Sequence, residues 1–77
     1  MTITQLEYIL SVAQHKNFTK AAQFCHVTQP TLSMQVQKLE EQLNIKIFDR
    51  SKKPIQLTGV GEKIVLQAKK LSLKQRE

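Results

Sequence analysis

The 77-residue sequence predicts a mainly α-helical domain, with three short helices, a small β-hairpin and a long final helix. Three observations lead to this prediction. Apolar residues recur at spacings of three and four in four separate segments, which is the helical period. Threonines stand near the starts of these segments, where a hydroxyl can cap the first turn. Two alternating apolar runs, residues 45–50 and 55–57, flank a turn that contains a proline, as in a β-hairpin.

The first helix is expected at residues 3–15. Thr4 with Glu7 matches the capping-box pattern, and so does Thr2 with Gln5, so two starting points stay open. The basic pair and the asparagine at 15–17 suit a helix end. The apolar stripe of this helix consists of Ile3, Leu6, Ile9, Leu10 and Ala13.

A short second helix is expected at residues 20–25, with Thr19 as its N-cap. Ala21 and Ala22 lie within it, and their small side chains would let another helix cross at close range. Residues 26–27 form the turn, and Val27 is expected to be buried there.

The third helix is expected to begin after a capping Thr28, with Pro30 in the first turn, where no N–H is required. Asn44 is a suitable end. The expected buried stripe is Leu32, Val36, Leu39 and Leu43, and the expected exposed side carries Gln29, Pro30, Thr31, Ser33, Met34 and Gln37, followed by Lys38, Glu40 and Glu41. The combination of helix, turn, helix and hairpin predicts a winged helix-turn-helix.

Thr58 is expected to cap the final helix, whose apolar stripe is Leu57, Val60, Ile64, Ala68 and Leu71. Gly59 and Gly61 lower helix propensity, so we expect a packing reason or a close backbone approach for them. The helical pattern runs to residue 77 without a stop signal, and we therefore expect the chain to be a piece of a longer protein.

Composition excludes several classes of protein. Apolar residues make up 40% and charged residues 23%, as in a soluble globular domain. No apolar run is long enough to span a membrane, and no signal peptide is expected. Cys25 alone cannot form an internal disulfide, which fits the reducing cytoplasm. Cys25 and His26 lack metal-ligand spacing, and no nucleophile–base set is present, so neither a metal site, a cofactor nor an enzyme is expected.

The net charge of +6 lies in the second half of the chain. Residues 1–45 hold three basic and three acidic side chains, and residues 46–77 hold nine and three. A basic field favours a polyanionic partner, with nucleic acid first and an anionic membrane surface second. A merely solubilising role for the lysines stays open on charge alone.

The start of the third helix carries hydroxyls and amides instead of the usual charges. The first turns of a helix reach base edges when it lies in the DNA major groove, where Gln can pair with adenine and Thr or Ser with a base or a phosphate. Pro30 and Met34 could contact a thymine methyl. The predicted base-reading residues are Gln29, Pro30, Thr31, Ser33 and Met34.

The basic hairpin turn adds a second argument for DNA, since its cations could lie along the phosphate backbone or in the minor groove. A lysine-protected edge strand is the alternative explanation. The predicted phosphate-contacting residues are Thr19, Thr28, Gln37, Lys38, Arg50, Lys52 and Lys53.

Three motifs carry a family resemblance: Phe-Thr-x-Ala-Ala at 18–22, Val-Thr-Gln-Pro-Thr-Leu-Ser at 27–33 and Leu-Glu-x-x-Leu at 39–43. With the following LTGVGEKI, they make the chain similar to the N-terminal winged helix-turn-helix domain of LysR-type transcriptional regulators over essentially its whole length. Within that family, residues 25–33 and 38–40 look most like the peroxide-responsive members.

The resemblance implies residues 1–57 as a DNA-binding domain, with the helix-turn-helix at 18–37 and the wing at 46–57. It implies that residues 58–77 form a linker helix that pairs two subunits, before an effector domain that this chain lacks. Members bind inverted-repeat operators as homodimers, often as dimers of dimers, and any peroxide-sensing cysteines would lie in the missing domain. The predicted dimerisation residues are Val60, Ile64, Ala68 and Leu71.

This chain departs from the family at two positions of the third helix. Members commonly carry Arg where this chain has Gln37, and often where it has Met34. Phosphate affinity is therefore expected to rest more on the wing. A second hypothesis stays open, in which the chain is a protein-interaction module that dimerises through its last helix and contacts an acidic partner through the basic wing.

Overall fold

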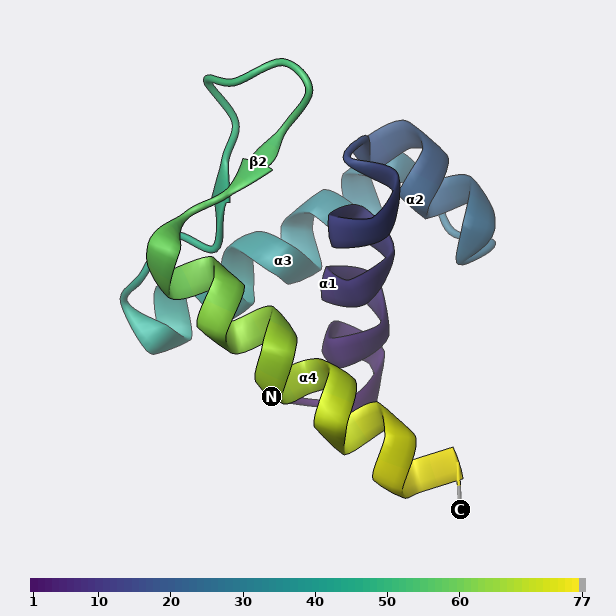
Figure 1. The fold of residues 1–77 in the computed structure, drawn as a ribbon. Coiled ribbons are helices and arrows are strands. Elements are labelled where there is room, and N and C mark those ends of the chain that lie inside the picture. The colour runs from purple at the N-terminus through teal and green to yellow at the C-terminus, as the bar shows by residue number, and fades with distance from the viewer. Residues whose placement is uncertain (77) are drawn as a thin grey trace.

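The structure is a computed structural model that describes residues 1–76, with side chains through residue 71. Its elements follow in the order α1 (Ile3–His15), α2 (Phe18–Phe24), α3 (Gln29–Leu43), β1 (Phe48–Asp49), β2 (Gln56–Leu57) and α4 (Gly59–Arg76). Figure 1 shows α1 in front of α3, with α2 beside them. The hairpin projects at the top of this view, and α4 runs along the bottom. This arrangement confirms the predicted winged helix-turn-helix architecture.

Helix α1 begins where one of the two capping boxes predicted it. The Gln5 amide donates to Thr2 Oγ1 at 3.0 Å, and the Thr2 amide donates to Gln5 Oε1 at 3.1 Å. The start at Thr4 is therefore wrong. The helix ends at His15, and the C-cap Lys16 adopts a left-handed conformation with φ 53°.

Asn17 was expected to end α1, but it caps the start of α2 instead. Its side chain accepts a hydrogen bond from the Lys20 amide at 2.9 Å, which makes it the N-cap of α2. The prediction of Thr19 as the cap is wrong, because α2 starts at Phe18, two residues before the predicted start at residue 20. The consequence is that Phe18 becomes a helical residue whose ring points into the core.

The turn between α2 and α3 runs through His26, in the left-handed region at φ 59°. Val27 follows and is only half-buried, less than predicted, although it still packs on the core. Thr28 caps α3 as expected: its Oγ1 accepts from the Thr31 amide at 3.3 Å. Pro30 lies in the first turn of α3, and Asn44 ends the helix at φ 56°.

The core lies where the first three helices meet the base of the wing. Ala21 and Ala22 are buried at the crossing of α2 with its neighbours, as their size predicted. The wing strand contributes Ile47 and Phe48, and α4 contributes Val65. The largest fully buried side chains are Ile9, Val12, Leu32, Val36, Leu39 and Ile47.

Two predictions for the last turns of α3 are wrong. Leu43, the last residue of α3, is 42% exposed. Glu40, expected on the solvent side, is 3% exposed. It lies four residues after Val36, so it shares the covered side of the helix.

The wing is an antiparallel hairpin with Phe48 paired to Leu57 and Asp49 to Gln56. Each strand has two residues, so the pairing is shorter than the alternating runs at 45–50 and 55–57 predicted. The rest of the wing is irregular and depends on contacts with the helices for its position.

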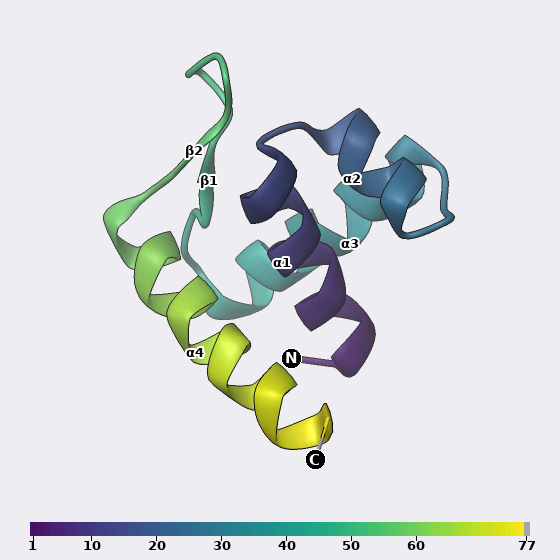
Figure 2. The same ribbon diagram turned by 45° about the vertical axis from the view of Figure 1, so that its right-hand side comes forward.

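Helix α4 packs along α1, as the turned view in Figure 2 shows. Thr58 caps it as predicted, with its Oγ1 accepting from the Gly61 amide at 2.9 Å. Only glycine fits at position 61, because a Cβ there would overlap the Ile47 carbonyl oxygen. A Cβ built at Gly59 would have no atom within 4 Å. Within the described residues, no helix combines the length and apolar character needed to cross a membrane.

Candidate nucleic-acid interface

The first turns of α3 present a continuous polar and apolar surface to solvent. Gln29, Pro30 and Thr31 are exposed, Met34 is 47% exposed, and Ser33 is half-buried. At about 100° per residue these five side chains spread around roughly half of the helix, so they line the solvent side of its first turns while the buried stripe faces inward.

The cap of α3 fixes how two of its hydroxyls are used. Thr28 Oγ1 accepts from the Thr31 amide, and its own proton is donated to Thr31 Oγ1 at 2.7 Å. Thr31 is therefore an acceptor toward Thr28, and its proton is left for another partner. At the start of α2, Thr19 is exposed, and its hydroxyl is spared a capping role because Asn17 supplies the cap.

Arg50 leaves the end of β1 and crosses toward the helices. Its Nη1 donates to Ser33 Oγ at 3.1 Å, and its Cζ lies 4.4 Å from the centre of the Phe18 ring. The guanidinium is thus brought to the exposed face of α3 by the wing. Lys52 and Lys53 remain exposed in the hairpin turn.

The hairpin turn is closed by a local network on Asp49. Its Oδ1 accepts from the Ser51 hydroxyl at 2.5 Å and from the Ser51 amide at 3.0 Å. The Ser51 hydroxyl and then its amide hold the pKa of the Asp49 carboxyl below its usual value, with a smaller contribution from the charge of Lys52. The carboxylate stays ionised at neutral pH and keeps the turn that presents the lysines.

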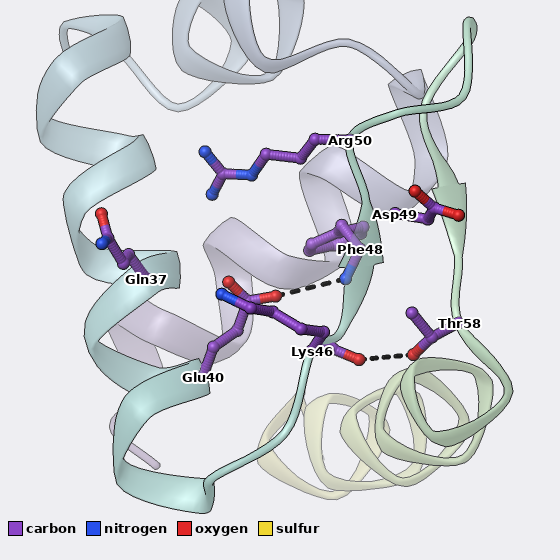
Figure 3. A pocket seen from close by; sticks show the side chains of 7 residues that line it. All are labelled: Gln37, Glu40, Lys46, Phe48, Asp49, Arg50 and Thr58. Atoms are coloured by element: carbon purple, nitrogen blue, oxygen red, sulfur yellow. Dashed lines mark hydrogen bonds between the residues drawn. The ribbon is translucent and has the colours of Figure 1, made fainter.

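A cleft of about 450 Å³ separates α3 from the wing. Figure 3 shows Arg50 reaching across it from the wing, with Gln37 on the facing helix and Glu40 beneath. Its lining residues are Gln37, Glu40, Lys46, Phe48, Asp49, Arg50 and Thr58. Lys38, the next residue of α3, is exposed.

Glu40 joins α3 to the wing. Its Oε2 accepts from the Ile47 amide at 2.7 Å and from the Phe48 amide at 3.3 Å. Figure 3 shows the bond to Phe48. Both bonds are buried, and hydrogen bonds to a charged acceptor are stronger than neutral ones. Sequence reasoning missed this residue because it was assigned to solvent by its charge, although its spacing from Val36 placed it on the covered side.

The predicted dimerisation residues do not lie on one surface. Val60 and Leu71 are exposed and Ile64 is half-buried, and their spacing places them along one side of α4. Ala68 is 0% exposed and lies inside this chain, about 40° to 60° around the helix from Ile64 and Leu71.

Comparison with protein families matches residues 3–62 to the bacterial regulatory helix-turn-helix proteins of the lysR family. Among curated proteins, the chain is 42% identical over 69 residues to the DNA-binding transcriptional dual regulator OxyR of Escherichia coli K12, and equally to the hydrogen peroxide-inducible genes activator of Pectobacterium carotovorum. Each match covers 90% of this chain and 23% of the relative, so the chain spans about a quarter of the length of these relatives.

Solved structures agree in fold. The DNA-binding domain of BenM, in complex with catB site 1 DNA, superposes with a TM-score of 0.96 at 36% identity, covering 99% of this chain and 82% of that one. Full-length OxyR C199D from Pseudomonas aeruginosa gives a TM-score of 0.92 at 51% identity, with 99% and 26% coverage. A complex of the CbnR DNA-binding domain with DNA gives 0.89 at 36% identity, with 99% and 88% coverage.

Proposed function

The chain belongs to the lysR family of bacterial regulatory helix-turn-helix proteins, and from this premise we propose that it binds double-stranded DNA sequence-specifically for transcription regulation. Its relatives are transcriptional regulators and not enzymes. The observation that carries the proposal is the face of α3, where uncharged hydrogen-bonding side chains lie beside a guanidinium supplied by the wing.

In this proposal the first turns of α3 enter the major groove, which admits one α-helix. Gln29 pairs with adenine through its amide, and the hydroxyls of Thr31 and Ser33 bond base edges. The Pro30 ring and the Met34 side chain contact thymine methyl groups.

Contacts to the DNA backbone come from both sides of α3 and from the wing. These contacts set register and most of the affinity without reading sequence. Because Met34 and Gln37 of α3 are uncharged, the wing supplies more of the positive charge. The proposed phosphate-contacting residues are Thr19, Thr28, Gln37, Lys38, Arg50, Lys52 and Lys53.

We further propose a homodimer formed through the exposed apolar side of α4, with Val60, Ile64 and Leu71 as its contacts. Ala68 supports this helix from within its own chain and is not a surface contact. Two copies of α3 would then enter successive major grooves one turn apart on an inverted repeat.

For the whole protein, we propose a peroxide-responsive regulator of the bacterial cytoplasm that assembles as a tetramer. The support for this narrower function is the identity with OxyR proteins of two species.

Replacing Gln29 tests the base-reading role. The ratio of specific to non-specific affinity should fall about tenfold in Gln29→Ala, because a lost amide–adenine pair removes discrimination and leaves phosphate contacts in place. The measurement is equilibrium binding to a selected site and to a random duplex at one salt concentration. Gln42→Ala, an exposed amide in the last turn of α3, is the matched control and should leave the ratio unchanged.

An unchanged ratio in Gln29→Ala would remove Gln29 from the reading face. If the unmodified chain shifts no random duplex at low salt, the DNA-binding proposal itself fails, and the protein-interaction hypothesis with an acidic partner replaces it.

A further inference from the structure

Arg50 is held at two points before any DNA is bound. Its Nη1 donates to Ser33 Oγ at 3.1 Å, and its guanidinium carbon lies 4.4 Å over the Phe18 ring. That ring is itself fixed, because Phe18 is buried and meets the Phe48 ring edge-on at 5.9 Å between centroids. A planar guanidinium can stack on an aromatic ring and donate a hydrogen bond from its edge at the same time.

The contact determines which hydrogen-bonding role Ser33 can take. A guanidinium has donors and no acceptor, so the Ser33 oxygen must accept from it. A serine hydroxyl has one proton, which can rotate to suit its surroundings. Arg50 occupies one of the two oxygen lone pairs, and its positive charge disfavours a second donor at the same oxygen, so the proton is directed to a different partner and Ser33 faces the groove as a donor.

We propose that Arg50 is a specificity-determining positioning residue that acts through Ser33. By holding Ser33 Oγ as an acceptor, it makes the hydroxyl a donor toward the major groove. Ser33 then selects a base edge that offers an acceptor, such as purine N7, guanine O6 or thymine O4, over the exocyclic amino group of cytosine. This inference rests on the proposed function, and it differs from the simpler role of Arg50 as a phosphate contact.

The base preference of variants tests the inference. The full 77-residue chain and its variants are each used to select bound duplexes from randomised DNA, and binding to single-base variants of the selected site is then measured at several salt concentrations. Ser33→Ala should relax discrimination at one base pair by about five- to tenfold. Arg50→Gln should relax the same base pair by a similar factor.

Two further variants separate orientation from charge. Arg50→Lys keeps the charge but lacks the planar fork, so it should relax the same base pair while the dependence of affinity on salt stays unchanged. Lys52→Gln removes one charge from the wing without touching Ser33, so it should weaken all duplexes alike and keep every preference. The double variant Arg50→Gln with Ser33→Ala should relax that base pair no further than Ser33→Ala alone, as expected for residues that act together.

The outcomes separate the two proposals. The inference is overturned if the Arg50 variants weaken all duplexes equally and keep the preference at the Ser33 base pair, or if they relax a base pair that Ser33→Ala does not affect. In either case the wild-type chain still selects a site, and the proposed function stands. A wild-type chain that selects no sequence contradicts the proposed function, and this inference with it.

Discussion

Glu40 is a buried charge whose partners are backbone amides of the wing instead of a basic side chain. Its carboxylate satisfies the Ile47 and Phe48 amides at the point where the chain leaves α3 and enters β1. Buried amides without acceptors would be unfavourable, so this side chain stabilises the approach of the wing to the helix. Through that contact it also holds the wing close to α3.

Glu40→Ala should lower the free energy of unfolding by about 3 kcal/mol, because two buried amides lose a charged acceptor. Urea unfolding followed by circular dichroism measures this loss. Glu41→Ala is the control, since Glu41 is the exposed neighbour, and it should change stability by less than about 0.5 kcal/mol. Equal effects of the two substitutions would show that the buried bonds contribute nothing measurable.

Gly61 lies where the backbone of α4 approaches the backbone of the wing too closely for any side chain. The first turn of α4 presses against the carbonyl of Ile47, and Thr58 anchors the same place by donating its amide to that carbonyl at 3.0 Å. The close approach of backbone to backbone leaves no room for a side chain.

Gly61→Ala should therefore destabilise the fold by about 2 kcal/mol through overpacking. Gly59→Ala should stabilise it by about 0.5 kcal/mol, because its Cβ would stand in open space and alanine favours the helix. Thermal unfolding of the two variants side by side gives the comparison. A stabilised Gly61→Ala would mean that α4 moves away from the wing without loss.

At the scale of elements, the wing is placed by its attachments more than by its own ladder. Two residue pairs form the sheet, and a hairpin of this size is at best marginal by itself. Three hydrogen bonds hold it: the Ile47 amide donates to Glu40 of α3, Arg50 donates to Ser33 of α3, and the Thr58 hydroxyl donates to the Lys46 carbonyl. The turn with its lysines therefore stands at a defined position relative to α3.

Lys52→Ala should weaken binding by a similar factor on all duplexes and reduce the slope of log affinity against log salt by about 0.9, as one phosphate contact is lost. Binding measured from low to high salt on specific and random duplexes gives both quantities. Lys69→Ala removes the same charge from α4 and should leave the slope unchanged. A loss confined to one sequence would contradict a phosphate contact.

At the scale of the whole molecule, α4 serves two surfaces. One side, with Val65 and Ala68, completes the core against α1. The adjacent side leaves Val60 and Leu71 exposed, and Leu66 is 57% exposed on the side turned away from the core. The helix can thus be a structural part of the domain and still offer an apolar stripe to a second copy.

Leu71→Glu should shift the chain toward monomer in sedimentation equilibrium, since a charge would enter the proposed apolar contact. Leu66→Glu is the control, because it places the same charge on a different side of α4, and it should leave the association unchanged. A wild-type chain that stays monomeric at high concentration would contradict the proposed dimer for this chain.

Much of the helical part could be predicted because its signals are local. Stripes, caps and turn residues placed the bounds of α1 and α3 correctly, and Thr28, Pro30, Asn44 and Thr58 have their expected roles. One error fell where two local rules compete. Asn17 and Thr19 are both good caps, and only the packing of Phe18 into the core decides between them.

The sequence by itself determined the order of the elements, the family and the uncharged polar character of the first turns of α3, since each depends on local spacing and residue type. The tertiary structure alone decided that Glu40 is buried, that Leu43 is exposed and that Ala68 belongs to the core. It also decided that Arg50 meets Ser33, 17 positions earlier in the chain. Each of these depends on which element covers which side of a helix. The apolar spacing within one segment does not indicate which other elements will pack against it.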